Sequence, residues 1–276
     1  MHISAQYFRV RFIRSARTVQ IFHGVGGKAW NISPKAQRYN RVFLVSEYDR
    51  RRFVNAGIFP ENSPALEVIG MPKVDCLVNG TLRQEPILES LGLSPEVPTL
   101  LYAPTWQHTS SLYKMGRELI AELASGPWNL IVKLHDNCYR PTETVNWERE
   151  TLPFRARPNV RIVRQPDISP FLIAADLLIS DLSSTALEYL LCDRPVIVAD
   201  APDLFARYAA DEVSRWQREI GPLLRDPAEA TALVRHALEH PEEFREVRQR
   251  IARTVFYDPG RATERAVASL YRLLGL

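Results

Sequence analysis

The stretch DLLISDLSSTALEYLL, residues 176–191, decides the fold class of this 276-residue chain. Its apolar first half predicts a buried strand over Leu177–Ser180, and its second half predicts a helix that begins near Thr185. A short polar loop separates the two. Strands that pass through such loops into helices are typical of parallel α/β folds, in which ligands bind beyond the carboxyl ends of the strands.

Further apolar, β-rich runs alternate with amphipathic stretches and extend this pattern along the chain. The other predicted strands are Thr18–Phe22, Val42–Val45, Leu66–Ile69, Thr99–Ala103, Leu130–Lys133, Val160–Val163 and Val196–Val198. From about Ala228 onward the pattern predicts helices alone. The fold class is therefore α/β. A proline-rich connector at 79–98 predicts an N-terminal domain of residues 1–80, abbreviated to about three strands, and a C-terminal domain of residues 81–276 that ends in helices.

Composition excludes several classes of protein. With 46% hydrophobic and 24% charged residues, the chain is neither disordered nor collagen-like. Three widely spaced cysteines with no CxxC pair predict neither a disulfide framework nor a thiolate zinc site, so a reducing cytoplasmic compartment is the default. No apolar run is long enough to span a membrane.

The charge is unevenly distributed along the chain. Residues 1–60 hold 11 Lys and Arg against 2 Asp and Glu, whereas the rest of the chain is acidic. A basic surface of this kind suits anionic lipid, a polyphosphate-type polymer or nucleic acid, and electrostatics alone does not choose among them.

The most specific chemical signal is the loop after Leu177–Ser180, where Asp181 ends the strand. Ser183 and Ser184 stand before the predicted helix, so their hydroxyls and the first N–H groups of the helix would form a phosphate site. The T-x-x-E spacing of Thr185 and Glu188 fits a capping box, which gives those two residues a structural explanation.

Three other predicted strands end in residues suited to phosphate binding or proton transfer. After Thr18–Phe22 these residues are His23 and Gly24 with the following Lys28. After Thr99–Ala103 they are Thr105 and Trp106, and at the end of Leu130–Lys133 they are Lys133, His135 and Asp136. A glycine lets backbone N–H groups approach an anion, a lysine supplies positive charge, and a histidine exchanges a proton near neutral pH. Each group taken alone also fits a structural role.

As an ordered set, these motifs resemble the CDP-glycerol glycerophosphotransferase family, the teichoic-acid-type polymerases and primases, over about Val19 to Leu270. The set consists of FHG at 22–24, G-x-P-[KR]-x-D at 70–75, YAPTW at 102–106, K-x-H at 133–135, ISDLSS at 179–184 with Glu188, RP at 194–195 and DPGRATER at 258–265. Each motif is short, and their order is what makes the resemblance specific.

The resemblance implies a GT-B-like architecture, with two Rossmann-like domains facing a cleft and the acceptor on the N-terminal side. It implies transfer of glycerol phosphate, or a related polyol phosphate, from a CDP-linked donor to a lipid-linked or polymeric hydroxyl acceptor, with release of CMP. Nucleic acid is not an expected partner. The expected location is the cytoplasm, where the basic N-terminal residues suit peripheral binding to the inner face of the cell membrane.

The resemblance also assigns roles to the strand-end residues. His23, as the acceptor base, and His135 are the candidate catalytic residues. The candidate donor-binding residues are Thr105, Trp106, Lys133, Asp181, Ser183, Ser184 and Glu188, the last of these at the ribose. Gly24 and Lys28 are assigned to the acceptor or to phosphate. The nucleotide is a substrate, so no cofactor is expected, and the absence of a D-x-D-like motif predicts no metal ligands.

The sequence departs from the family pattern in several places. Gln107 and His108 replace the usual Arg-Asp, Asp136 replaces a proline, and HGVGGK replaces an HGTPLK-like sequence. FHG lies only about 20 residues from the start, which indicates a minimal N-terminal domain or a fragment. Two alternatives remain open: a GT-B sugar-nucleotide glycosyltransferase or UDP-sugar epimerase relative, and a non-catalytic nucleotide- or polymer-binding remnant.

Overall fold

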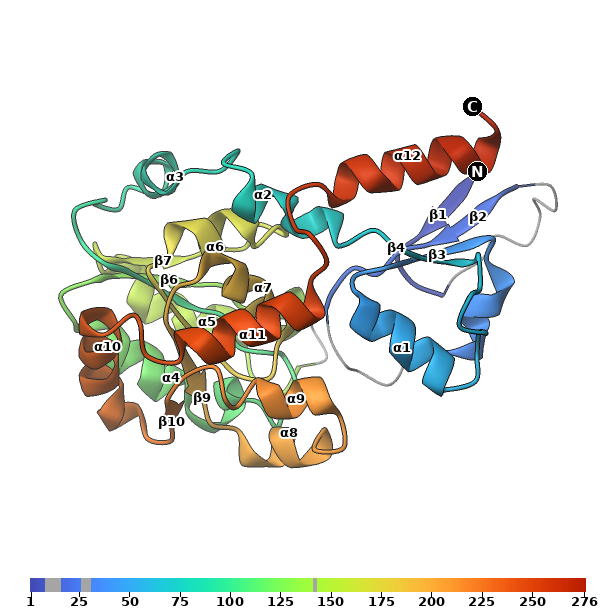
Figure 1. Ribbon diagram of the computed structural model, residues 1–276. Coiled ribbons are helices and arrows are strands. Elements are labelled where there is room, and N and C mark those ends of the chain that lie inside the picture. The colour runs from blue at the N-terminus through green and yellow to red at the C-terminus, as the bar shows by residue number, and fades with distance from the viewer. Residues whose placement is uncertain (8–15, 26–30, 141–142) are drawn as a thin grey trace. The chain divides into compact units, whose positions relative to one another are not determined.

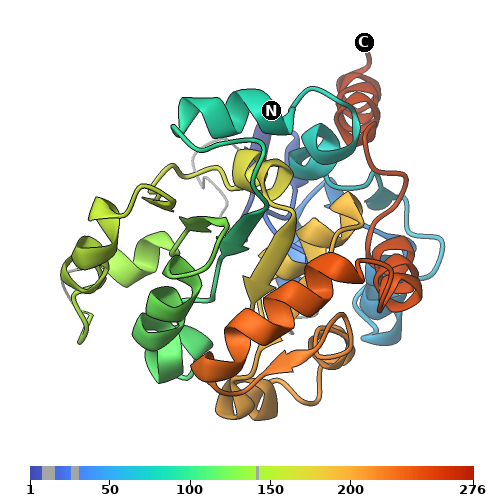
Figure 2. The same cartoon turned by 90° about the vertical axis from the view of Figure 1, so that its left-hand side faces the viewer.

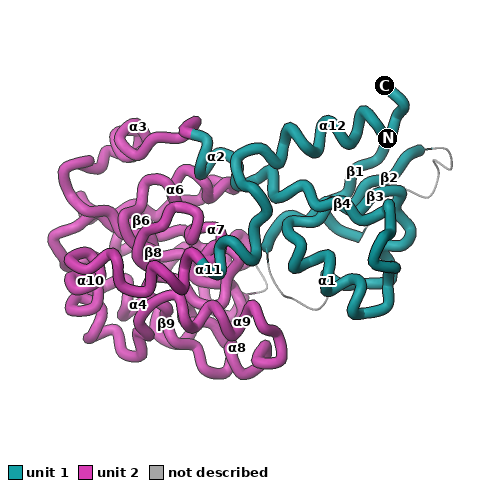
Figure 3. Tube along the Cα trace, viewed as in Figure 1, with its two compact units in different colours: residues 1–79, 250–276 teal, residues 80–249 magenta. Residues whose placement is uncertain are grey.

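The computed structural model describes residues 1–7, 16–25, 31–140 and 143–276. The chain divides into two compact units (Figure 3). The first unit consists of residues 1–79 together with 250–276, and the second of residues 80–249. The boundary near residue 250 lies within helix α11 (Arg245–Val255), so the chain leaves the first unit once and returns to it at its end.

The first unit contains a four-stranded parallel sheet in the order β1-β2-β3-β4 (Figure 1). Its strands are β1 (His2–Ser4), β2 (Thr18–Gln20), β3 (Arg41–Leu44) and β4 (Leu66–Val68), and its helices are α1 (Glu47–Asn55), α2 (Asp75–Val78) and α12 (Ala262–Leu274). Helix α1 packs the buried Phe53 among Phe22, Val42 and Leu44. Helix α12 places Ala266 in a second cluster with Val19 and Phe43.

Helix α1 begins with a side-chain cap at Ser46. The hydroxyl of Ser46 accepts a hydrogen bond from Asp49 N at 3.4 Å. Burial raises the pKa of the Asp49 carboxyl to about 6, and the Arg52 charge and hydrogen bonds from the Val45 and Ser46 backbone oppose this shift. Ser46 and Asp49 therefore cap the helix reciprocally.

The second unit contains a six-stranded parallel sheet in the order β10-β9-β8-β5-β6-β7. The strands are β5 (Thr99–Tyr102), β6 (Asn129–Val132), β7 (Val160–Ile162), β8 (Leu177–Ser180), β9 (Val196–Ala199) and β10 (Leu223–Leu224). The helices are α3 (Gln84–Ser90), α4 (Ser111–Ala124), α5 (Trp147–Thr151), α6 (Ser169–Ala174), α7 (Ser184–Tyr189), α8 (Pro202–Arg207), α9 (Glu212–Trp216) and α10 (Ala230–Glu239). Helices lie on both sides of this sheet (Figure 2), which is why β5, β6, β8 and β9 are continuous apolar runs.

All eight predicted strands are present, and α10, α11 and α12 confirm the prediction of helices after Ala228. The short strands β1 and β10, of three and two residues, were not predicted.

The sequence predicts one domain over residues 81–276, whereas the structure assigns residues 250–276 of that range to the first unit. Those residues belong with the first unit, because Ala266 and Leu270 of α12 pack against Val19 and Phe43 of its sheet.

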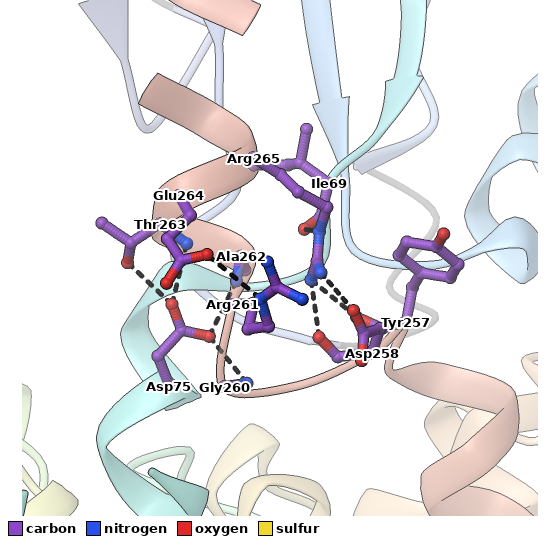
Figure 4. A network of polar contacts seen from close by, with 10 residues as sticks. All are labelled: Ile69, Asp75, Tyr257, Asp258, Gly260, Arg261, Ala262, Thr263, Glu264 and Arg265. Carbon is purple, nitrogen blue, oxygen red and sulfur yellow. Dashed lines mark hydrogen bonds and ion pairs between the residues drawn. The ribbon is translucent and has the colours of Figure 1, made fainter. Parts of the chain in front are cut away.

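Two of the sequence motifs, Gly70–Asp75 and Asp258–Arg265, meet in the first unit (Figure 4). The buried Asp75 carboxylate accepts four hydrogen bonds, from the backbone N–H groups of Gly260, Ala262 and Thr263 and from the Thr263 hydroxyl, at 2.7–3.0 Å. Three of these donors lie at the start of α12, so Asp75 caps that helix from a distant part of the chain.

Gly70 and Arg265 complete the same network. Gly70 has φ +87°, and a Cβ atom there would lie 2.6 Å from the Tyr257 carbonyl oxygen, so only glycine fits this position. Arg265 donates to the Ile69 carbonyl at 2.7 Å and pairs with Asp258. These two motifs therefore hold α12 on the first sheet.

Candidate active site

Polar residues from three neighbouring strands meet at one edge of the second unit. Strands β8, β5 and β6 are adjacent in the sheet and parallel, so their carboxyl ends lie at the same edge. The loops that leave these ends contain most of the predicted donor-binding residues, among them Thr105, Lys133 and Asp181. This is the edge at which open α/β sheets bind ligands.

Asp181 lies at the centre of this edge and holds two of the loops together. Its carboxylate is 1% exposed and accepts hydrogen bonds from Thr105 N at 2.8 Å, Ser111 N at 2.9 Å and the Ser111 hydroxyl at 2.8 Å. Burial raises the pKa of Asp181, and these hydrogen bonds oppose the shift. These hydrogen bonds fix the loop after β5 and the start of α4, which makes Asp181 a positioning residue.

The loop after β8 corrects the predicted capping box. The N-cap of α7 is Ser183, whose hydroxyl accepts from Thr185 N at 3.2 Å, so the box based on Thr185 and Glu188 is wrong. Ser183 N–H also donates to Gln217 Oε1 at 2.9 Å, while Ser183 and Ser184 are both half-buried. Glu188 has 0% exposure, which leaves its side chain no surface to offer a ribose.

Lys133 and His135 follow β6 and differ in exposure. Lys133 is 6% exposed, its ammonium donates to the Leu134 carbonyl at 3.3 Å, and burial lowers its pKa. His135 is exposed and accepts from Asn137 N at Nδ1, at 3.1 Å. The ring centroids of His135 and Trp106 lie 6.1 Å apart, so the loops after β5 and β6 present two aromatic rings side by side.

The predicted acceptor residues belong to the first unit. His23 is exposed, and its Nδ1 lies 3.1 Å from the carbonyl oxygen of Ala5. Gly24 lines a small pocket together with Asp49 and Phe53. Lys28, the third residue of this set, lies outside the described residues.

Comparison with known proteins identifies the family of the chain. A family profile described as CDP-Glycerol:Poly(glycerophosphate) glycerophosphotransferase matches residues 16–272. The chain belongs to this glycerophosphotransferase family. It is accordingly an enzyme of the transferase class. A search of curated proteins gave no match.

Solved structures support the fold expected for this glycerophosphotransferase. The wall teichoic acid polymerase TagF is 16% identical and has a TM-score of 0.72, with the match covering 94% of this chain and 68% of TagF. A TagF variant soaked with CDPG is 17% identical, with a TM-score of 0.73 and coverage of 98% and 71%. An S. aureus MnaA–UDP structure is 15% identical, with a TM-score of 0.55 and coverage of 96% and 71%. These similarities confirm the GT-B-like α/β fold.

The structure assigns contacts to the departures from the family pattern. Gln107 Nε2 lies 3.1 Å from the Tyr208 hydroxyl, and His108 Nε2 lies 2.9 Å from Glu143 Oε2. Asp136, in place of the usual proline, has a carboxylate oxygen 3.8 Å from the Lys133 ammonium. The residues that differ from the family pattern thus contact other residues of the same unit.

Sequence reasoning missed Ser111 and Gln217, which orient the loops after β5 and β8. Neither residue follows a strand. Ser111 contacts Asp181 across 70 residues and Gln217 contacts Ser183 across 34, so no spacing could have indicated them.

Over residues 1–7, 16–25, 31–140 and 143–276, no group of three or more His, Cys, Asp or Glu side chains is arranged to hold a metal ion.

Proposed function

We propose that the enzyme transfers glycerol phosphate, or a related polyol phosphate, from a CDP-linked donor to a hydroxyl acceptor in cell-envelope polymer synthesis. The observation that carries the proposal is the family match over residues 16–272. The acceptor oxygen attacks the glycerol-side phosphorus, the bond from this phosphorus to the CMP oxygen breaks, and CMP leaves. The proton of the acceptor hydroxyl passes to His23.

The hydrogen bond of His23 suits it to act as the base. A carbonyl oxygen only accepts, so the contact with Ala5 requires a proton on Nδ1. A neutral imidazole with its proton on Nδ1 has its lone pair on Nε2, and that nitrogen can take a proton from an alcohol. This is the tautomer that the proposed reaction requires.

The residues after β5, β6 and β8 are proposed to hold the donor. His135 accepts a hydrogen bond at Nδ1, so its neutral ring carries the proton on Nε2, where it can donate to a phosphate oxygen. Lys133 contributes positive charge, and the hydroxyls of Ser183 and Ser184 contribute donors. Phosphoryl transfer depends mainly on such alignment and charge stabilisation. The nucleotide is a substrate, and we include no resident cofactor.

The proposed acceptor is a lipid-linked or polymeric alcohol presented at the inner face of the membrane. The first unit holds 17 Lys and Arg against 7 Asp and Glu, whereas the second holds 18 against 25. Among the described helices, none has the length and apolar character needed to cross a bilayer. The positive unit supports peripheral binding to anionic lipid.

Vesicle binding tests this membrane proposal. We expect the protein to cosediment with vesicles that contain anionic lipid and to be released as the salt concentration rises, because salt screens exposed charges over roughly 10 Å at 0.1 M. Neutral vesicles are the control. Equal binding to neutral and anionic vesicles would contradict the electrostatic account.

Isothermal titration with CDP-glycerol, CMP and UDP-N-acetylglucosamine tests the donor assignment. We expect the cytidine ligands to bind and the uridine ligand to bind much more weakly. Replacing Ser183 and Ser184 together by alanine should weaken CDP-glycerol binding by about ten-fold or more, because two neutral hydrogen bonds to phosphate are lost. Preference for the uridine ligand would instead indicate a sugar-nucleotide enzyme.

A further inference from the structure

A pocket in the second unit lies beyond the ends of β6 and β7. It has a volume of about 190 Å³, and the residues that line it include Tyr139, Arg140, Glu143 and Arg164. This volume is below the roughly 300–1,000 Å³ of pockets that enclose a complete small ligand. It therefore suits one ring of a larger molecule.

The position of the pocket relates it to the proposed donor site. Tyr139 and Glu143 follow β6, Arg164 follows β7, and Ser183 follows β8. In the order β8-β5-β6-β7 these strand ends are two and three spacings apart, or about 10 and 14 Å at about 4.8 Å per strand. That separation is comparable to the extended length of a nucleoside diphosphate from its terminal phosphate to its base.

Glu143 is held in place as a hydrogen-bond acceptor. His108 Nε2 contacts its Oε2 at 2.9 Å, and the Tyr113 hydroxyl donates to the same oxygen. These hydrogen bonds, first from Tyr113 and then from His108, lower the pKa of Glu143, so the side chain is a carboxylate at neutral pH. Within the described part of the chain, the hydrogen bonds from Tyr113 and His108 both end on Oε2, which leaves Oε1 as the oxygen for a ligand.

Another part of the pocket provides a flat surface. The Arg164 guanidinium stacks over the Tyr139 ring, 3.9 Å from its centroid, and pairs with Glu148 at 2.7 Å. An arginine stacked on an aromatic ring presents a planar face on which a base can stack.

We propose that this pocket receives the cytosine of the CDP-linked donor and that Glu143 selects cytosine over uracil. This inference rests on the proposed function and extends it to the base. The cytosine amino group donates a hydrogen bond, for which a carboxylate is the matching acceptor. Uracil has a carbonyl oxygen at the same ring position, and that oxygen would face the Glu143 carboxylate without a proton between them. Arg140, an exposed residue of the same pocket, supplies donors for the ring nitrogen and carbonyl.

Titration of CMP and UMP tests the assignment. Wild-type enzyme should bind CMP at least about ten-fold more tightly than UMP, because a well-formed side-chain pair to a base edge discriminates by about 1–3 kcal/mol. Glu143→Gln should reduce this ratio to near one, since an amide can donate to the uracil oxygen. Glu150→Gln is the matched control, because Glu150 lies nearby in α5, pairs with Arg117 at 3.2 Å and does not line the pocket.

A second variant keeps the test decisive if Glu143→Gln does not fold. Arg140→Gln alters an exposed side chain of the pocket, so its melting temperature should be unchanged. Its affinity for CMP should fall roughly 2- to 10-fold.

Three outcomes would contradict the inference. If wild-type enzyme prefers CMP and both variants keep that preference and affinity, the base lies elsewhere while the proposed function stands. If CMP and UMP bind equally, Glu143 selects nothing. If neither CMP nor CDP-glycerol binds, the proposed function fails together with the pocket.

Discussion

Replacing His23 by alanine is expected to lower kcat for glycerol phosphate transfer by at least about 100-fold, the effect typical of removing a general base. The contact of Nδ1 with the Ala5 carbonyl places the lone pair on Nε2, and an alanine has no group that can accept the hydroxyl proton. His23 belongs to the first unit, whereas the predicted donor contacts belong to the second. The affinity for CDP-glycerol should therefore change by less than about two-fold, a difference of only a few tenths of a kcal/mol.

The measurement is steady-state transfer with CDP-glycerol, combined with titration of the same ligand. His236→Ala is the matched control. His236 is an exposed histidine of α10, and its Nε2 lies 3.0 Å from Glu243 Oε1. Partial recovery of His23→Ala by added imidazole would support proton transfer in particular. A variant that turns over normally, or one that loses donor binding to the same extent as turnover, would exclude the role of base.

Most of the fold could be predicted because buried parallel strands produce continuous apolar runs. Strands such as β5 and β8 are buried on both faces and are bounded by polar loops, so each gave an unambiguous signal. Strand β1 (His2–Ser4) contains a single apolar residue and strand β10 consists of two residues, so neither forms an apolar run that a sequence pattern could detect. The return of α12 to the first unit depends on Asp75 and Thr263, 188 residues apart, which local pattern reasoning does not connect.

The candidate site was predictable in its position and less so in the roles of its residues. Because ligands bind at strand ends, residues such as Lys133 and Ser183 could be identified from the apolar runs before them. The sequence could not show that Asp181 is fully buried with hydrogen bonds from Thr105 and Ser111, or that Glu188 is buried. A polar residue after a strand can either contact a ligand or hold a loop by hydrogen bonds. Its residue type is the same in both cases, and only the tertiary structure shows which role it has.

Replacing Asp75 by alanine is expected to destabilise the docking of α12 by about 3 kcal/mol, since a buried carboxylate that accepts four hydrogen bonds is removed and their donors are left unpaired. A loss of this size corresponds to roughly 150-fold faster hydrogen exchange if the helix exchanges by local opening. Amide exchange in α12 is therefore the measurement. Amide exchange in the buried strands β5 and β8 of the second unit is the internal reference, and it should be unchanged.

The matched control is Glu264→Ala on the same helix, because Glu264 and its partner Arg261 are each about 70% exposed, and an ion pair this exposed contributes at most about 1 kcal/mol. Asp75→Asn should lie between the two, since its amide retains one oxygen acceptor and loses the other. Unchanged exchange in α12 of the Asp75→Ala protein would show that apolar packing of Ala266 and Leu270 on Val19 holds the helix by itself. The Gly70–Asp75 motif would then need an explanation other than the anchoring of α12, because its carboxylate would contribute nothing measurable to the position of that helix.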